Sequence, residues 1–178
     1  MASLRLVAID AGVLAAFRES PVALESSVGA TLGPAAAAVS QVLEQTVGFL
    51  AGKPCDPAWG CFLAVDEAGG QVVGTCAYKG GPAADGSVEV AYRTFPPFEG
   101  RGYATGMAAA LAARAGPRRV LAHTLPERNA SCRVLEKAGF IWAGEVIDAE
   151  DGLVWRWVAD AEPVAAADGG GGQAFPGS

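Results

Sequence analysis

The segment of the chain that is best suited to chemistry spans residues 88–111 and reads VEVAYRTFPPFEGRGYATGMAAAL. It joins a β-rich run to an amphipathic helical pattern through two prolines and a glycine-containing turn. The first amides of a helix have no intrahelical acceptors, and the helix dipole is positive there. The backbone N–H groups of Gly102, Tyr103 and Ala104, with Arg101 beside them, therefore predict a seat for a phosphate group. An ordinary turn into a helix explains the same glycines.

The rest of the sequence predicts the elements that must position this segment. We expect one α/β domain over residues 1–160, with a largely antiparallel sheet and one parallel βαβ step in its middle. The glycine-rich residues 161–178 are expected to form a mobile tail. The expected strands cover residues 4–8, 61–66, 71–79, 88–95, 118–124, 140–148 and 152–158, and the expected helices run from Asp10 to about Ser20, from Pro34 to about Gly52, over 102–115 and over 129–138.

Two segments resemble the GCN5-related N-acetyltransferase (GNAT) family. That family has an acetyl-CoA loop of the form Q/R-x-x-G-x-G/A at a strand–loop–helix junction, and the corresponding string here is Glu99-Gly100-Arg101-Gly102-Tyr103-Ala104. Downstream, NASCRVLEKAGF resembles the N-x-x-S-x-x-V-L-E-K-x-G-F signature of the branch similar to the ribosomal-protein N-acetyltransferases RimJ and RimL. Glu99 departs from the family, and an acidic group there is expected to weaken pyrophosphate binding without abolishing it.

The resemblance implies a splayed sheet and acetyl-CoA as co-substrate, with no metal. The backbone of Tyr92, Arg93 and Thr94 would pair with the pantetheine arm as an added strand does. The loop Glu99–Ala104 would hold the pyrophosphate. The acceptor amine would attack the thioester directly, without a covalent enzyme intermediate, and a backbone N–H of the same strand would stabilise the oxyanion.

Glu89 is the residue that we predict as general base. Direct attack needs a neutral amine, and a lysine-type amine with a pKa of about 10.4 is almost fully protonated near neutral pH. Glu89 lies three residues before Tyr92, and strand alternation places it on the side of Ala91 and Arg93. The alternative is an exposed strand carboxylate that pairs with Arg93.

In the branch that the chain resembles, the serine of the downstream signature is the proposed proton donor to the CoA thiolate. Ser131 takes that role here, and Asn129 would contact the pantetheine. Both residues also suit a helix start, Asn129 as N-cap and Ser131 in the first turn. His123 either contacts substrate, relays a proton, or is a satisfied histidine at a strand end. Trp155 and Trp157 either pack in the core or form an acceptor wall.

Composition excludes several other classes of function. Thirteen basic and nineteen acidic side chains give a formal net charge of −6, the wrong sign for a phosphate backbone, so no nucleic-acid partner is expected. Four cysteines without a C-x-x-C pair, and a single histidine, indicate free thiols rather than a metal site. The N-terminus reaches Asp10 before a signal sequence could form, and no apolar run is long enough for a membrane helix. We therefore expect a cytoplasmic protein without membrane contact.

The acceptor is expected to be a primary amine, either a protein N-terminus or a small molecule. The acidic net charge favours a cationic acceptor. A homodimer is common among the proteins that the chain resembles. The alternative function is a non-catalytic acyl-CoA-binding module of the same fold, which binds the thioester without turnover.

Overall fold

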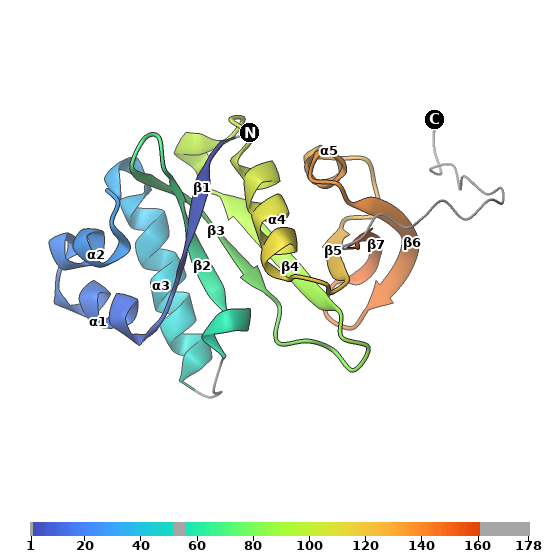
Figure 1. The fold of residues 1–178 in the computed structure, drawn as a ribbon, viewed down its shortest axis with the longest axis horizontal. Coiled ribbons are helices and arrows are strands. Elements are labelled where there is room, and N and C mark those ends of the chain that lie inside the picture. The colour runs from blue at the N-terminus through green and yellow to red at the C-terminus, as the bar shows by residue number, and fades with distance from the viewer. Residues whose placement is uncertain (1, 52–55, 161–178) are drawn as a thin grey trace.

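The computed structural model describes residues 2–51 and 56–160, in which five α-helices flank seven β-strands (Figure 1). The expected tail at 161–178 and the expected helix stop near residues 52–54 lie outside the described residues. The elements in chain order are β1 (Leu4–Ala8), α1 (Ala11–Glu19), α2 (Pro21–Val28), α3 (Ala36–Leu50), β2 (Cys61–Asp66), β3 (Gln71–Tyr78), β4 (Val88–Thr94), α4 (Tyr103–Arg114), β5 (Val120–Thr124), α5 (Ala130–Lys137), β6 (Ile141–Asp148) and β7 (Gly152–Ala159), with short 3-10 turns at Gly33–Ala35, Pro57–Trp59 and Pro96–Phe98.

The seven strands form one mixed sheet in the order β1-β2-β3-β4-β5-β7-β6. Each neighbouring pair is antiparallel except β4 and β5, which α4 connects in parallel. This confirms the predicted α/β class and the single βαβ step in the middle of the sheet. In Figure 1, α1, α2 and α3 gather at the β1 end of the sheet, and α5 lies beside β5 and β7 at the other end.

The N-terminal helices follow local capping rules, but one of them was not predicted. Asp10 caps α1 as expected, with its carboxylate accepting from the backbone N–H of Val13 at 2.9 Å. Ser20 then ends α1 and at once caps α2, whose first residue is Pro21. The predicted end of the first helix near Ser20 is confirmed, but α2 was not predicted, although proline is also favoured at the first position of a helix.

A glycine on β3 allows α4 to pack close to the sheet. Gly74 on β3 faces Thr94 on β4. A Cβ built on Gly74 would lie 2.6 Å from the carbonyl oxygen of Arg93 and 2.9 Å from Cε of Met107 on α4. Met107 is fully buried, so α4 packs against the β3–β4 pair at van der Waals distance.

Aromatic side chains anchor the loop between β4 and α4. Phe95, Phe98 and Tyr103 are buried, and the rings of Phe98 and Tyr103 meet edge to face with centroids 6.3 Å apart. The hydroxyl of Tyr103 donates to Oδ2 of Asp66 at the end of β2, at 3.1 Å. These buried side chains therefore fix the start of α4 to the sheet, while the loop residues 99–102 stay exposed.

Candidate active site

The parallel strands β4 and β5 separate soon after they meet. Their ladder consists of Val88 opposite Val120 and Glu89 opposite Leu121, and the remainder of β4 pairs only with β3. A cavity of about 350 Å³ lies where the two strands diverge. It is lined by Lys79, Glu89, Val90, Ala91, Tyr92, Ala122, His123, Thr124, Leu125, Ser131, Asp151 and Val154.

The backbone of β4 beyond Glu89 offers hydrogen-bonding groups toward this gap. The N–H of Val88 donates to the carbonyl of Arg119 before β5, whereas the N–H of Phe95 donates to Val73 on β3. Because backbone groups alternate along a strand, those of Tyr92 and Thr94 point the same way as those of Val88, away from β3. Arg93 lies opposite Thr75, so its backbone faces β3, and its side chain is exposed and does not line the cavity.

Glu89 lies at the mouth of the gap in a network of charged side chains. Its Oε1 is 3.0 Å from Nζ of Lys79 and 3.1 Å from Nδ1 of His123. The carboxylate is therefore partly buried and paired across β3 and β5. The structure does not pair Glu89 with Arg93, which was the alternative; its partners are Lys79 and His123.

Lys79 carries a positive charge in this network. Burial favours its neutral form, but the hydrogen bond and charge of Glu89, together with Asp151 and Asp148, outweigh burial and raise the pKa of the Lys79 ammonium. Asp148 is itself held as a carboxylate, because backbone N–H groups of Asp151 and Glu150 lower its pKa, and the charge of Lys79 acts in the same direction. This side of the cavity thus combines three carboxylates with one ammonium.

The other face of the sheet supplies two hydroxyl groups. Tyr92 on β4 and Ser131 in the first turn of α5 place their oxygens 3.0 Å apart, and both line the cavity. Burial raises the pKa of Tyr92, and the hydrogen bond with Ser131 opposes that effect only in part. The phenol therefore stays protonated at neutral pH, and the pair retains two O–H protons for one shared hydrogen bond.

Asn129 caps α5, and its spacing to Ser131 differs from the signature that the sequence analysis used. Its side-chain oxygen accepts from the backbone N–H of Cys132 at 3.1 Å. The chain has one residue between Asn129 and Ser131, where the signature has two. The serine keeps its spacing to Val134 and the following residues, so the match holds for Ser131 and is displaced by one position for Asn129.

The loop residues predicted to hold a pyrophosphate lie together at the start of α4. Gly102 is the N-cap with φ +83°, and no side chain of the described residues caps the helix. A Cβ built on Gly100 or Gly102 would meet no atom within 4 Å, so the Cβ side of both glycines is open. Arg101 and Glu99 are exposed, with the guanidinium of Arg101 5.6 Å from the centroid of the Phe98 ring. Ala104 is half-buried in the first turn.

The structure gives both ring nitrogens of His123 a partner at the cavity and buries the two tryptophans. His123 is hydrogen-bonded through both ring nitrogens, to Glu89 and to Nε of Arg156. Trp155 and Trp157 are buried and do not line the cavity; their indole N–H groups donate to Glu145 and Thr124. The two tryptophans thus belong to the core rather than to an acceptor wall.

Sequence reasoning did not identify Lys79, Asp148, Asp151 or Arg156 as part of this site. Strand alternation would have placed Arg156 on the face opposite the buried Trp155 and Trp157. It could not have shown that this face meets His123, because that depends on β7 lying next to β5. Within residues 2–51 and 56–160, no helix has the length and apolar character needed to cross a bilayer.

Comparisons with known proteins agree with this geometry. A family model described as an acetyltransferase (GNAT) domain matches residues 4–141. A crystal structure of spermidine N-acetyltransferase from Vibrio cholerae in complex with CoA and spermine aligns with a TM-score of 0.60 at 15% identity, covering 89% of this chain and 95% of that one. An acetyltransferase of the GNAT family from Bacillus anthracis aligns with a TM-score of 0.59 at 16% identity, covering 92% and 98%. At these identities the alignments show a shared fold.

Other structural alignments are shorter. A chimera of the Vibrio cholerae enzyme with hSSAT aligns over 57% of this chain, and this chain spans 66% of that one, with a TM-score of 0.49. No curated protein matches the chain.

Proposed function

The chain belongs to the GNAT acetyltransferase family, and from that premise we propose that it transfers an acetyl group from acetyl-CoA to a primary amine in the cavity between β4 and β5. The observation that carries this proposal is the meeting of Glu89 and Ser131 from opposite faces of the sheet in one cavity, at the point where β4 leaves β5. A carboxylate that can take a proton and a hydroxyl that can give one thus flank a single space.

The fit of the chain to acetyl-CoA rests on two features. The space at the Cβ positions of Gly100 and Gly102 is open and no side chain of the described residues caps α4, which suits a pyrophosphate at the first amides of the helix. The backbone groups of Tyr92 and Thr94 are not in a ladder with β5, which suits an extended pantetheine arm, and Asn129 lies nearby at the start of α5. Bound there, acetyl-CoA supplies the acetyl group as a thioester. Arg93 would contribute through its strand pairing and not through its side chain.

We assign the two proton transfers to opposite sides of the cavity. Glu89 accepts the proton of the attacking amine through its carboxylate, directly or through a water. Ser131 donates a hydrogen bond or a proton to the departing sulfur. Tyr92 stabilises the serine oxygen in this step by donating a hydrogen bond to it. Glu89 thus takes a proton where positive charge forms on the amine, and Ser131 gives one where negative charge forms on the sulfur.

The acceptor that this site favours is a cationic primary amine. Glu89, Asp148 and Asp151 outnumber Lys79 and Arg156 around the mouth of the cavity, and the whole chain carries a net charge of −6. Both a protein N-terminus, as in the ribosomal-protein N-acetyltransferase-like branch, and a small-molecule amine satisfy this chemistry. The domain that performs the reaction would comprise residues 1–160.

The test is CoA thiol release from acetyl-CoA with a panel of primary amines, measured for the wild type and for Glu89→Gln. The variant should lower kcat by about a hundredfold, the order that a general base contributes. Glu136→Gln is the matched control. Glu136 lies on α5 outside the cavity, and its carboxylate pairs with Arg128. Acetyl-CoA binding without amine-dependent thiol release would instead identify a binding module. Unchanged turnover of Glu89→Gln across pH would remove Glu89 from the reaction.

A further inference from the structure

We propose that Arg156 fixes His123 as the neutral Nδ1–H tautomer, so that His123 is a positioning residue that holds the Glu89 carboxylate and not a base or a proton relay. The inference rests on the proposed function for its catalytic consequence. The tautomer itself depends only on the contacts of three side chains.

The hydrogen-bond chemistry of the three residues leaves one arrangement. Nε of Arg156 lies 3.2 Å from Nε2 of His123. An arginine Nε is always protonated and can only donate, so Nε2 must present a lone pair. A neutral imidazole then carries its proton on Nδ1, which lies 3.1 Å from Oε1 of Glu89. The ring donates to the carboxylate and accepts from the guanidinium.

The position of the ring supports a fixed orientation. The His123 side chain is only 7% exposed, and it lies on β5 between β4, which carries Glu89, and β7, which carries Arg156. The other charged groups around it are Asp148 on β6, whose Oδ2 is 4.0 Å from Nδ1, and Lys79 directly after β3, which contacts the same Glu89 oxygen and also pairs with Asp151. A separation of 4.0 Å is too long for a hydrogen bond, so Glu89 is the partner of Nδ1.

This arrangement has a consequence for the path of the proton. Nδ1 already holds a proton and Nε2 is occupied by Arg156, so neither ring nitrogen can accept the proton that Glu89 takes from an amine. The two contacts to Glu89, from His123 and from Lys79, both end on Oε1. Within the described residues no side chain or backbone group is hydrogen-bonded to Oε2, so the network directs this oxygen to the substrate.

The single histidine of the chain allows a direct test by NMR. Long-range nitrogen–proton spectra of the full-length protein contain one imidazole, so the two ring nitrogens need no residue assignment. At about pH 8, well above the reference histidine pKa of about 6.5, we expect a protonated Nδ1 and an unprotonated Nε2. A spectrum of the Nε2–H tautomer, or of a doubly protonated ring, overturns the proposal.

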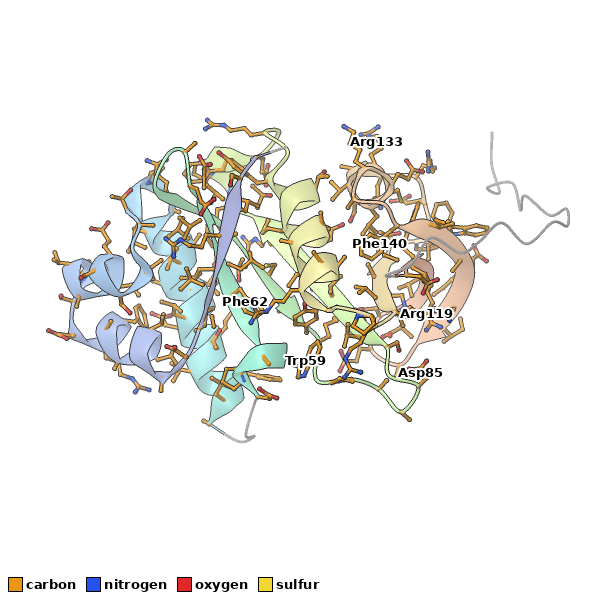
Figure 2. All side chains as sticks on the ribbon, viewed as in Figure 1. Trp59, Phe62, Asp85, Arg119, Arg133 and Phe140 are labelled. Atoms are coloured by element: carbon orange, nitrogen blue, oxygen red, sulfur yellow. The ribbon has the colours of Figure 1, made fainter. Side chains whose placement is uncertain are left out.

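Variants separate the role of Arg156 from general folding. Arg156→Met keeps the length of the side chain and removes the donor, so the ring signals should lose the pure Nδ1–H pattern. Arg119→Met is the control. Arg119 pairs with Asp160 and lies at the outer surface of the β5–β7 region in Figure 2, and its loss should leave the imidazole spectrum unchanged. An unchanged spectrum in Arg156→Met contradicts the assignment.

Activity tests the positioning role. His123→Asn retains a side-chain N–H that can reach the carboxylate, whereas His123→Ala does not. We expect kcat of the alanine variant to fall about tenfold, as the loss of one hydrogen bond to a charged group implies, with the acetyl-CoA KM nearly unchanged and kcat largely restored in the asparagine variant. Equal losses in two folded variants overturn the positioning role. An Nδ1–H spectrum in a protein that acetylates no amine would refute the proposed function and leave the tautomer intact.

Discussion

Ser131 and Tyr92 form a hydrogen-bonded pair of hydroxyl groups at the wall of the cavity. Neither residue has a charge, and each could be satisfied by water if it stood alone. Their oxygens are 3.0 Å apart in a partly buried setting, and burial raises the pKa of the phenol. The raised pKa keeps the proton on Tyr92, so the tyrosine can donate to Ser131 and leave the serine proton for a departing thiolate.

This coupling predicts non-additive effects in a double-mutant cycle. Ser131→Ala should lower kcat by about ten- to a hundredfold, with a smaller effect on acetyl-CoA affinity, because the hydroxyl acts on charge that forms during the reaction. Tyr92→Phe should lower kcat less. The double variant should be little worse than Ser131→Ala alone, since Tyr92 acts through the serine. Steady-state kinetics of the four proteins test this, and strictly additive losses would show that the two hydroxyls act independently.

At the scale of elements, the site depends on the close approach of α4 to the β3–β4 pair. At Gly74, the carbonyl of Arg93 and the side chain of Met107 lie so close that a residue with a Cβ would not fit. Both strands and the helix meet there, directly before the chain enters the loop 95–102. A shift at this contact therefore moves both the end of β4 and the start of α4, which are the two parts that we propose to bind acetyl-CoA.

Gly74→Ala should accordingly destabilise the fold and weaken acetyl-CoA binding together. The added methyl group would have to displace backbone or a buried methionine, and overpacking of this kind costs about 1–3 kcal/mol. Gly48→Ala in α3 is the matched control, because nothing lies within 4 Å of its Cβ position. It should stabilise the helix by about 0.5–1 kcal/mol. Urea unfolding and calorimetric titration with CoA measure both effects, and equal stability of the two variants would contradict the close approach.

At the scale of the whole molecule, two buried ionisable groups in the core, Cys76 and Tyr78, should make the folded state less stable at alkaline pH. Burial, and secondarily the nearby Cys61, raises the pKa of the Cys76 thiol to about 12. Burial also raises the pKa of Tyr78 to about 12, against the opposing charge of Arg114, and the phenol donates to the carbonyl of Leu111 at 2.7 Å. Tyr78 connects β3 to α4 through this hydrogen bond only in its neutral form, and Cys76 is buried on the same strand.

The sign of the pH effect follows from these two groups. As pH rises above about 9, an unfolded chain loses the thiol proton while the folded chain keeps it. The contribution of these two groups to the free energy of unfolding should therefore be constant below that pH and fall toward about pH 12, from about pH 9 for Cys76 and from about pH 10 for Tyr78, by up to about 1.4 kcal/mol per pH unit for each group. Urea unfolding from about pH 8 to about pH 11 tests this. Cys76→Ala should start less stable but decline less steeply, and an identical decline would exclude Cys76 as a cause.

Several parts of this protein could be predicted from the sequence because they depend on neighbours along the chain. Asp10 and Asn129 cap their helices, Pro96 and Pro97 stop β4, and Gly102 begins α4 with a left-handed backbone. Capping, proline geometry and positive φ are properties of a few consecutive residues. For the same reason the strands and the glycine turn into α4 could be predicted. Pro21 was misjudged because a local signal allows both a stop and a start.

The sequence by itself determined which residues could give, take or hold a proton, and on which elements they lie. Only the tertiary structure decided which of them meet. Arg156, His123 and Glu89 come together because β7 inserts between β5 and β6 and β5 lies beside β4, and Tyr92 reaches Ser131 because α5 packs at the point where β4 leaves β5. Alternation along a strand is a local property, whereas the order of strands in a sheet is set by the packing of segments far apart in the chain.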